Sequence, residues 1–126
     1  LIIELNGGLI TQDDCLKALS ICDGAMIGRA AYSHPMRWKD IDEVVYGEPN
    51  KNISPSIIIK ELIPYTQNHL RNNGRIWDIC RHLVNLVEDV PGARLWRKEF
   101  CLKTQNKKAD INAMEKAALQ LHNAGL

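Results

Sequence analysis

Two short segments of the sequence combine glycine with a side chain that can hold an anion. Asn6-Gly7-Gly8 follows the apolar run Leu1–Leu5, and Gly28-Arg29 follows Ala25–Ile27. Glycine lets the backbone approach a ligand closely, the start of a helix presents free N–H groups, and a guanidinium can donate two parallel hydrogen bonds to phosphate oxygens. The pattern favours a phosphate site, but ordinary turns with Arg29 on the surface would give the same sequence.

A second group of candidate residues is basic. Residues 94–108 contain six lysines and arginines against one acid, Glu99. The basic triplet, defined here as Arg94, Arg97 and Lys98, is spaced to share one face of a helix. Such a face could contact RNA phosphates, or it could be an ordinary solvated surface. Trp77 and Trp96 could likewise stack on bases or fill a helical core.

The remaining reactive side chains show no metal-binding or catalytic pattern. No two histidines have ligand spacing, and none of the four cysteines forms a C-x-x-C pair. Arg81 and His82 are neighbours on an expected helix, so we expect them to point in different directions. We therefore predict no metal site, no Ser/His/Asp or Cys/His catalytic set, and reduced thiols in a cytoplasmic protein.

A parallel β-α-β unit is predicted to position the glycines. Leu1–Leu5 is expected to be a largely buried strand, residues 11–22 a helix capped by Thr11, and Ala25–Ile27 a second strand. Parallel sheets are normally covered on both faces, and two strands leave two open edges. We therefore expect the chain to be the C-terminal part of a longer α/β protein. Its missing strands would lie upstream of Leu1 or come from a second copy, by self-association through the open edges.

Helices are predicted for most of the rest of the chain. Short helices are expected at residues 29–32 and 38–46, and the polar segment Glu48–Asn52 is the expected domain boundary. Beyond it we expect four helices, at 55–71, 76–90, 93–103 and from 111 onward. Ser54 and Asp110 are the expected N-caps, and Pro64 should kink the first of these helices. Ile58, Leu62, Tyr65 and His69 form one expected apolar stripe.

Composition and charge restrict the class of protein. The 126 residues are 45% hydrophobic and 25% charged, which is typical of a globular protein and not of a disordered or disulfide-stapled one. The longest apolar run, residues 57–59, is far below the ~20 residues of a membrane span. The net charge of +1 divides into −3 for residues 1–52 and +4 for residues 53–126, which suggests two parts with different partners.

The motifs resemble those of the tRNA-dihydrouridine synthases. Residues 3–8 and 23–32 resemble the last two barrel strands of that family. Arg81–Leu83, Pro91–Lys98 and Ala109–Asn112 are similar to its A-type members. The resemblance covers almost the whole chain, in order and with compatible spacing.

The resemblance implies an α/β plus all-α fold. Residues 1–52 would be the C-terminal β-α-β-α portion of an FMN-binding TIM (β/α)₈ barrel, and residues 53–126 a helical tRNA-binding domain resembling a four-helix bundle. The family reduces uridine to dihydrouridine in the D-loop of tRNA, with FMN as cofactor and NADPH as reductant. By resemblance, the FMN phosphate site is lined by Asn6, Gly7, Gly8, Gly28 and Arg29, and the residues near the tRNA are Arg81, Arg94, Arg97 and Lys98.

The sequence also departs from the family. The catalytic cysteine is expected upstream of Leu1, none of the four cysteines matches its motif, and the chain alone is expected to be inactive. His34 stands where the family usually has Asn, so no role is assigned to it. Two alternatives stay open: a non-catalytic helical RNA-binding module, which would bind tRNA without flavin, and another FMN-dependent TIM-barrel oxidoreductase, which would have no tRNA affinity.

Overall fold

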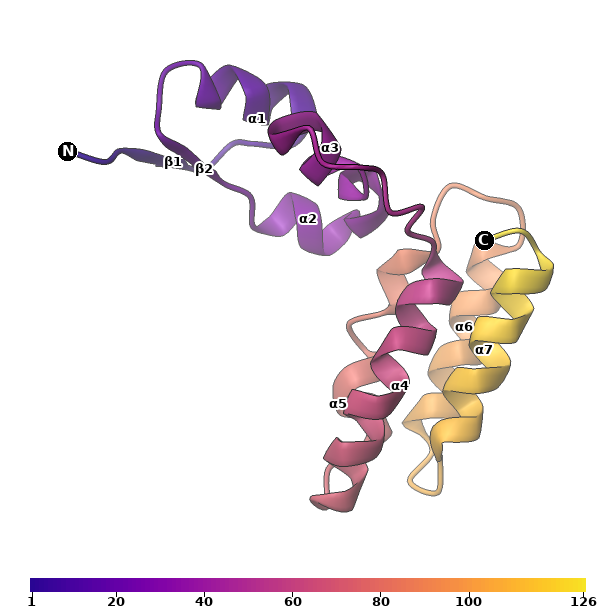
Figure 1. Cartoon of the computed structure of the whole chain (residues 1–126). Helices are drawn as coiled ribbons and strands as arrows, with labels where there is room; N and C mark the ends of the chain where they lie inside the picture. The colour runs from indigo at the N-terminus through magenta and orange to yellow at the C-terminus, as the bar shows by residue number, and fades with distance from the viewer. The chain divides into compact units, whose positions relative to one another are not determined.

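The computed structural model describes all residues from Leu1 to Leu126, and the chain forms two compact units, Leu1–Asn52 and Ile53–Leu126 (Figure 1). The division follows the polar segment Glu48–Asn52. No helix combines the length and the apolar character that crossing a membrane requires. The identity of the units, as barrel portion and tRNA-binding domain, stays a prediction.

A parallel two-stranded sheet lies at the start of the first unit. β1 (Glu4–Asn6) pairs with β2 (Gly24–Met26) so that Leu5 lies opposite Ala25, and α1 (Gln12–Leu19) is the crossover helix. Thr11 caps α1 as expected: its hydroxyl accepts the N–H of Asp14 at 3.1 Å, and the Asp14 carboxylate accepts the N–H of Thr11 at 2.9 Å. This reciprocal capping fixes where α1 begins.

The expectation of a largely buried first strand is wrong. Every residue of β1 is exposed, and Leu1 and Ile2 before it are exposed as well. The hydrophobic residues indicated a strand correctly, but a sheet of two short strands has no second layer to cover both its faces. β2 lies one residue earlier than expected, and α1 ends at Leu19 rather than near Cys22.

Three short helical segments complete the first unit. They are α2 (Arg29–Ser33), the 3₁₀ segment η1 (Pro35–Trp38) and α3 (Ile41–Tyr46). The single helix expected over 38–46 is therefore wrong. Trp38 ends the 3₁₀ segment, and α3 begins only at Ile41. Gly47 ends α3 as predicted, because at a φ of 66° its N–H reaches the carbonyl of Glu43 at 2.9 Å.

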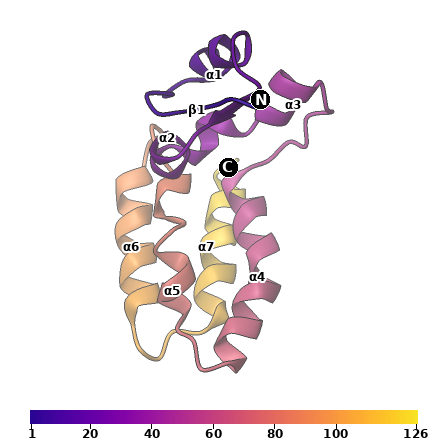
Figure 2. The ribbon, with the colours of Figure 1, turned by 90° about the vertical axis from the view of Figure 1, so that its left-hand side faces the viewer.

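The second unit is entirely helical. It contains α4 (Pro55–Arg71), α5 (Ile76–Cys80), the 3₁₀ segment η2 (Val84–Leu86), α6 (Ala93–Gln105) and α7 (Ile111–Asn123). Figures 1 and 2 show α4 and α7 side by side, and this is the most extensive helix pair of the unit. Its core includes Ile59, Phe100 and Met114, none of them more than 2% exposed.

Local signals predicted most helix ends of this unit. The Ser54 hydroxyl accepts the N–H of Ile57, and the Asp110 carboxylate accepts the N–H of Asn112. α4 continues through Pro64, as expected of a proline that does not end its helix. The single helix expected over 76–90 is wrong, because the chain leaves α-helical geometry after Cys80, and only the 3₁₀ segment η2 follows before residue 90.

Candidate functional site

A cavity of about 610 Å³ in the first unit lies where both strands end. The segments Asn6–Ile10 and Gly28–Ala30 line it, together with Met26, Ser33 and His34. The structure therefore brings together all five residues predicted for a phosphate site: Asn6, Gly7, Gly8, Gly28 and Arg29. They meet because parallel pairing puts the carboxyl ends of β1 and β2 at one edge of the sheet.

The glycine segment after β1 has a backbone that other residues rarely adopt. Gly7 and Gly8 have φ values of 127° and 71°, in the left-handed region that favours glycine. A Cβ added to either would meet no atom within 4 Å, so the space in front of them is open. Glycine is thus required here by backbone conformation, and the open space leaves room for a ligand to approach the main chain.

The charge around this cavity suits an anion. No lining residue is acidic, and Arg29 is exposed with no hydrogen bond or ion pair inside the chain. The expected contribution from a helix start needs correction, because α2 has only five residues. A short helix has a weak dipole, so the guanidinium of Arg29 and the loop amides are the groups available for a phosphate.

A second cavity in the same unit has the opposite character. It also measures about 610 Å³ and lies between the sheet, α1 and α3, with three carboxyl side chains in its lining, Glu4, Asp23 and Asp42. Negative charge there disfavours a phosphate by like-charge repulsion. Of these two cavities, the glycine-lined one has the lining that suits an anionic ligand.

The cations predicted to lie near RNA belong to two helices of the second unit. Arg94, Arg97 and Lys98, the basic triplet, occupy the first two turns of α6; Arg94 and Lys98 are exposed and Arg97 is half-buried. No acidic side chain pairs with the triplet. Arg81 lies at the end of α5 and is exposed.

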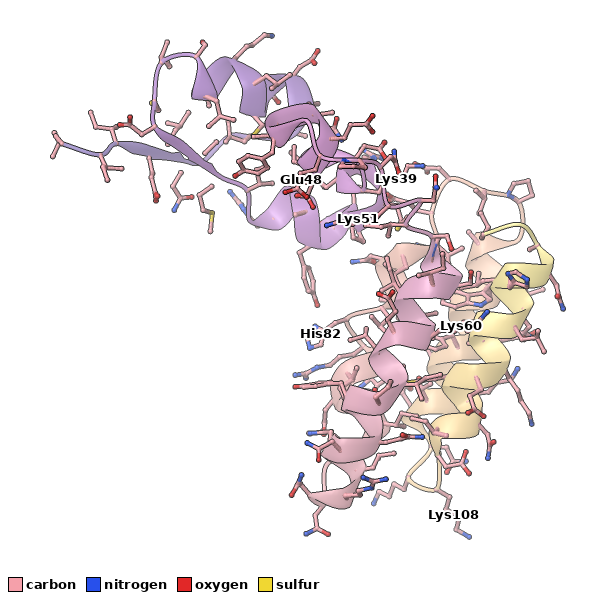
Figure 3. All side chains as sticks on the ribbon, viewed as in Figure 1. Lys39, Glu48, Lys51, Lys60, His82 and Lys108 are labelled. Carbon is pink, nitrogen blue, oxygen red and sulfur yellow. The ribbon has the colours of Figure 1, made fainter.

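One expectation about these cations is wrong. Arg81 and His82 do not diverge: the Arg81 Nε–H donates to Nε2 of His82 at 3.1 Å. The chain leaves α-helical geometry at this point, so the usual angle between neighbouring side chains does not apply. Figure 3 shows His82 projecting from the side of the helical unit.

The other candidate side chains have structural partners. His69 Nε2 lies 3.0 Å from Asp78 Oδ2, and this hydrogen bond is the main reason that the pKa of Asp78 is below its usual value. Burial raises the pKa of the Cys80 thiol to about 12, so Cys80 stays protonated inside the core. No group of three or more histidine, cysteine or acidic side chains could hold a metal ion.

Of the aromatic residues, Trp96 follows one of the two sequence-based alternatives and Tyr65 departs from its expected position. Trp96 stacks on Phe100 with ring centroids 4.8 Å apart, so its ring packs within the helical unit. Tyr65, expected in the inward stripe of α4, is 63% exposed. Its place on the helical wheel, at the edge of the stripe beside Glu61 and Asn68, is the signal that could have shown this.

The first unit joins an α/β crossover to a glycine-lined cavity, and the second is an all-helical unit with an unpaired basic surface. A model of the dihydrouridine synthase family matches residues 1–123, and the chain belongs to this family.

Curated relatives agree with this assignment. The tRNA-dihydrouridine(20/20a) synthase of Shewanella oneidensis is 32% identical over 115 residues, which cover 91% of this chain and 34% of the relative. The protein of the same name from Escherichia coli K12 is 30% identical over 117 residues, covering 93% and 34%. That of Synechocystis sp. is 37% identical over 98 residues, covering 78% and 29%. The chain thus spans about a third of the length of these relatives.

Proposed function

We propose that this chain acts in the reduction of uridine to dihydrouridine in tRNA, with FMN as cofactor and NADPH as reductant. In this proposal, residues 1–52 are the last part of a (β/α)₈ barrel and hold the FMN phosphate, and residues 53–126 bind the tRNA. The observation that supports it best is the cavity that brings Asn6, Gly7, Gly8, Gly28 and Arg29 together. Family membership supplies the reaction class.

The residues at the cavity fit the phosphate end of FMN. A phosphomonoester needs several donors and no nearby carboxylate, and the lining offers the Arg29 guanidinium, the Asn6 amide and glycine backbone without any acid. FMN, when bound, supplies the hydride for the reduction. The residues of this chain would orient the cofactor by holding its phosphate. The reacting ring would be held by contacts outside this cavity.

The basic triplet and Arg81 are the proposed tRNA contacts. Exposed cations without carboxylate partners can neutralise RNA phosphates and release counterions, which gives affinity that falls with salt. The helical unit also carries the positive part of the chain's charge, +4 against −3 for residues 1–52. A small-molecule FMN oxidoreductase would have no use for this surface.

Flavin binding by the chain tests the proposal, with riboflavin as the ligand that lacks only the phosphate. We expect tighter binding of FMN than of riboflavin, measured by equilibrium dialysis, which does not require the ring to contact the protein. Arg29→Ala should weaken FMN binding about 10-fold, because a charge-assisted hydrogen bond contributes roughly 1.5–3 kcal/mol and exposure favours the lower end. Riboflavin binding should not change.

The matched control is Lys39→Ala, which removes an exposed cation of the same unit outside the cavity lining (labelled in Figure 3). It should leave the preference for FMN intact. Equal affinity for FMN and riboflavin in the unmodified chain, or an FMN affinity unaffected by Arg29→Ala, would contradict the phosphate assignment. tRNA binding without any flavin binding would favour the RNA-binding module instead.

A further inference from the structure

Tyr65 is a large aromatic side chain that the helical unit leaves in solvent. It is 63% exposed, although its position in α4 belongs to a stripe with Leu62 and His69, both half-buried. Asn68, one turn further along the same flank, is exposed as well. A tyrosine ring combines an apolar face with a polar hydroxyl, and its face is suited to stacking on another planar group.

A hydrogen bond between α4 and α5 lies one turn from Tyr65. α4 and α5 run antiparallel, joined by a tight turn (Figures 1 and 2), and His69 of α4 meets Asp78 of α5 at 3.0 Å. Asp78 also accepts the N–H of Arg75 at 2.8 Å, which anchors the start of α5. A Cβ at Gly74 would overlap the His69 ring, so glycine in the turn allows this contact.

This contact sets the register of the two helices. Tyr65 lies four residues before His69, and Arg81 and His82 lie three and four residues after Asp78. Because the helices are antiparallel, all three lie about one turn from the hydrogen bond, in the same direction. Arg81 keeps its guanidinium near His82 through the 3.1 Å bond from Nε. An exposed ring and a planar cation therefore lie at about the same level along two neighbouring helices.

We propose that Tyr65, with Arg81 beside it, is a stacking site for an unpaired nucleobase of RNA bound to the helical unit. The inference rests on the proposed tRNA-binding function and adds to it a contact with a base rather than a phosphate. Unpaired bases in RNA stack on aromatic rings and guanidinium planes. Glu61, the only acid of α4, lies one turn before Tyr65 and disfavours phosphates there. In this proposal the RNA strand therefore approaches Tyr65 from the α5 side.

The test compares an oligouridylate with an abasic ribose-phosphate oligomer of equal length and charge. The unmodified chain should bind the oligouridylate more tightly. Tyr65→Ala should weaken binding of the oligouridylate roughly 5-fold to 150-fold, because stacking on an aromatic contributes ~1–3 kcal/mol per base. Binding of the abasic oligomer should not change. Tyr65→Phe should keep most of the affinity, and Tyr65→Leu, which preserves apolar bulk without an aromatic face, should behave like Tyr65→Ala.

Salt dependence separates the two partners of the site. Tyr65→Ala should lower affinity equally at all salt concentrations, whereas Arg81→Ala should also flatten the salt dependence by about one phosphate's contribution. Tyr46→Ala is the matched control, since Tyr46 is 76% exposed and belongs to the other unit. Circular dichroism of each variant serves to check that its helices are kept.

Two failures lead to different conclusions. If Tyr65→Ala binds the oligouridylate as the unmodified chain does, while neutralising the basic triplet weakens binding, the stacking site is refuted and the proposed function stands. If the unmodified chain binds neither oligomer nor tRNA, the proposed tRNA-binding function is itself refuted, and the stacking site with it.

Discussion

Replacing Ile59 by alanine should strongly destabilise the helical unit. Ile59 is 0% exposed and lies on α4, the helix whose main packing partner is α7. The change removes three buried carbon atoms, which at ~0.8 kcal/mol each is about 2.4 kcal/mol of lost transfer free energy. A rigid helical core collapses only partly around the gap, so a cavity cost adds to this. We expect the free energy of unfolding to fall by about 3–4 kcal/mol.

Ile57→Ala is a matched control for this experiment. It makes the same chemical change in the same helix, but Ile57 is 40% exposed and its methyl groups are partly in water already. It should cost less than ~1.5 kcal/mol, because no closed cavity forms. Urea titrations of the chain and both variants, followed by circular dichroism at 222 nm, give the two differences directly.

The comparison can refute the packing of Ile59 in the core. Equal shifts of the urea midpoint for the two variants would mean that residue 59 is no more buried than residue 57 in solution, and that α4 packs on another face. A lower denaturant slope for Ile59→Ala alone would indicate a native state that has already lost compactness.

Two further predictions concern charge. Replacing all three residues of the basic triplet with glutamine should weaken tRNA binding and reduce the slope of log affinity against log salt by about 2. Each phosphate contact contributes ~0.7–0.9 to this slope, and Arg97 is half-buried. An unchanged slope would mean that the triplet is only solvated. The pKa of Asp78 is lowered from 3.8, first by the His69 hydrogen bond and then by the Arg75 N–H. The contribution of Asp78 to stability is therefore present above pH 3.8 and is lost as pH falls through the lowered pKa. Asp78→Asn should therefore lower stability at neutral pH and flatten its decline in acid, as urea midpoints between about pH 2 and 7 would show.

Local chemistry made the helix starts predictable. Thr11, Ser54 and Asp110 were each expected to cap a helix, and each side chain accepts the N–H it should. A cap depends on residues within one turn of each other, so no tertiary contact is needed to specify it. The end of α3 at Gly47 was predictable for the same reason.

Features that depend on distant contacts were not predictable in this way. The break after Cys80 interrupts an apolar periodicity that fits one helix from 76 to 90, and only packing in the helical unit selects the interruption. The exposure of β1 is another example. Its apolar residues predict a strand that is buried on both faces, but they do not identify the elements that cover those faces.

The two candidate sites show the same contrast. The glycine-lined cavity joins segments about twenty residues apart, yet its residues could be named in advance, because parallel strands joined by a crossover always end at the same edge. The proposed placement of Arg81 beside Tyr65 depends instead on the register of α4 against α5, which the His69–Asp78 hydrogen bond marks. A shift of one residue along either helix turns a side chain by about 100° and would separate the ring from the guanidinium. Asp78→Ala tests this dependence, because losing the hydrogen bond to His69 should weaken binding of base-bearing RNA more than binding of the abasic oligomer.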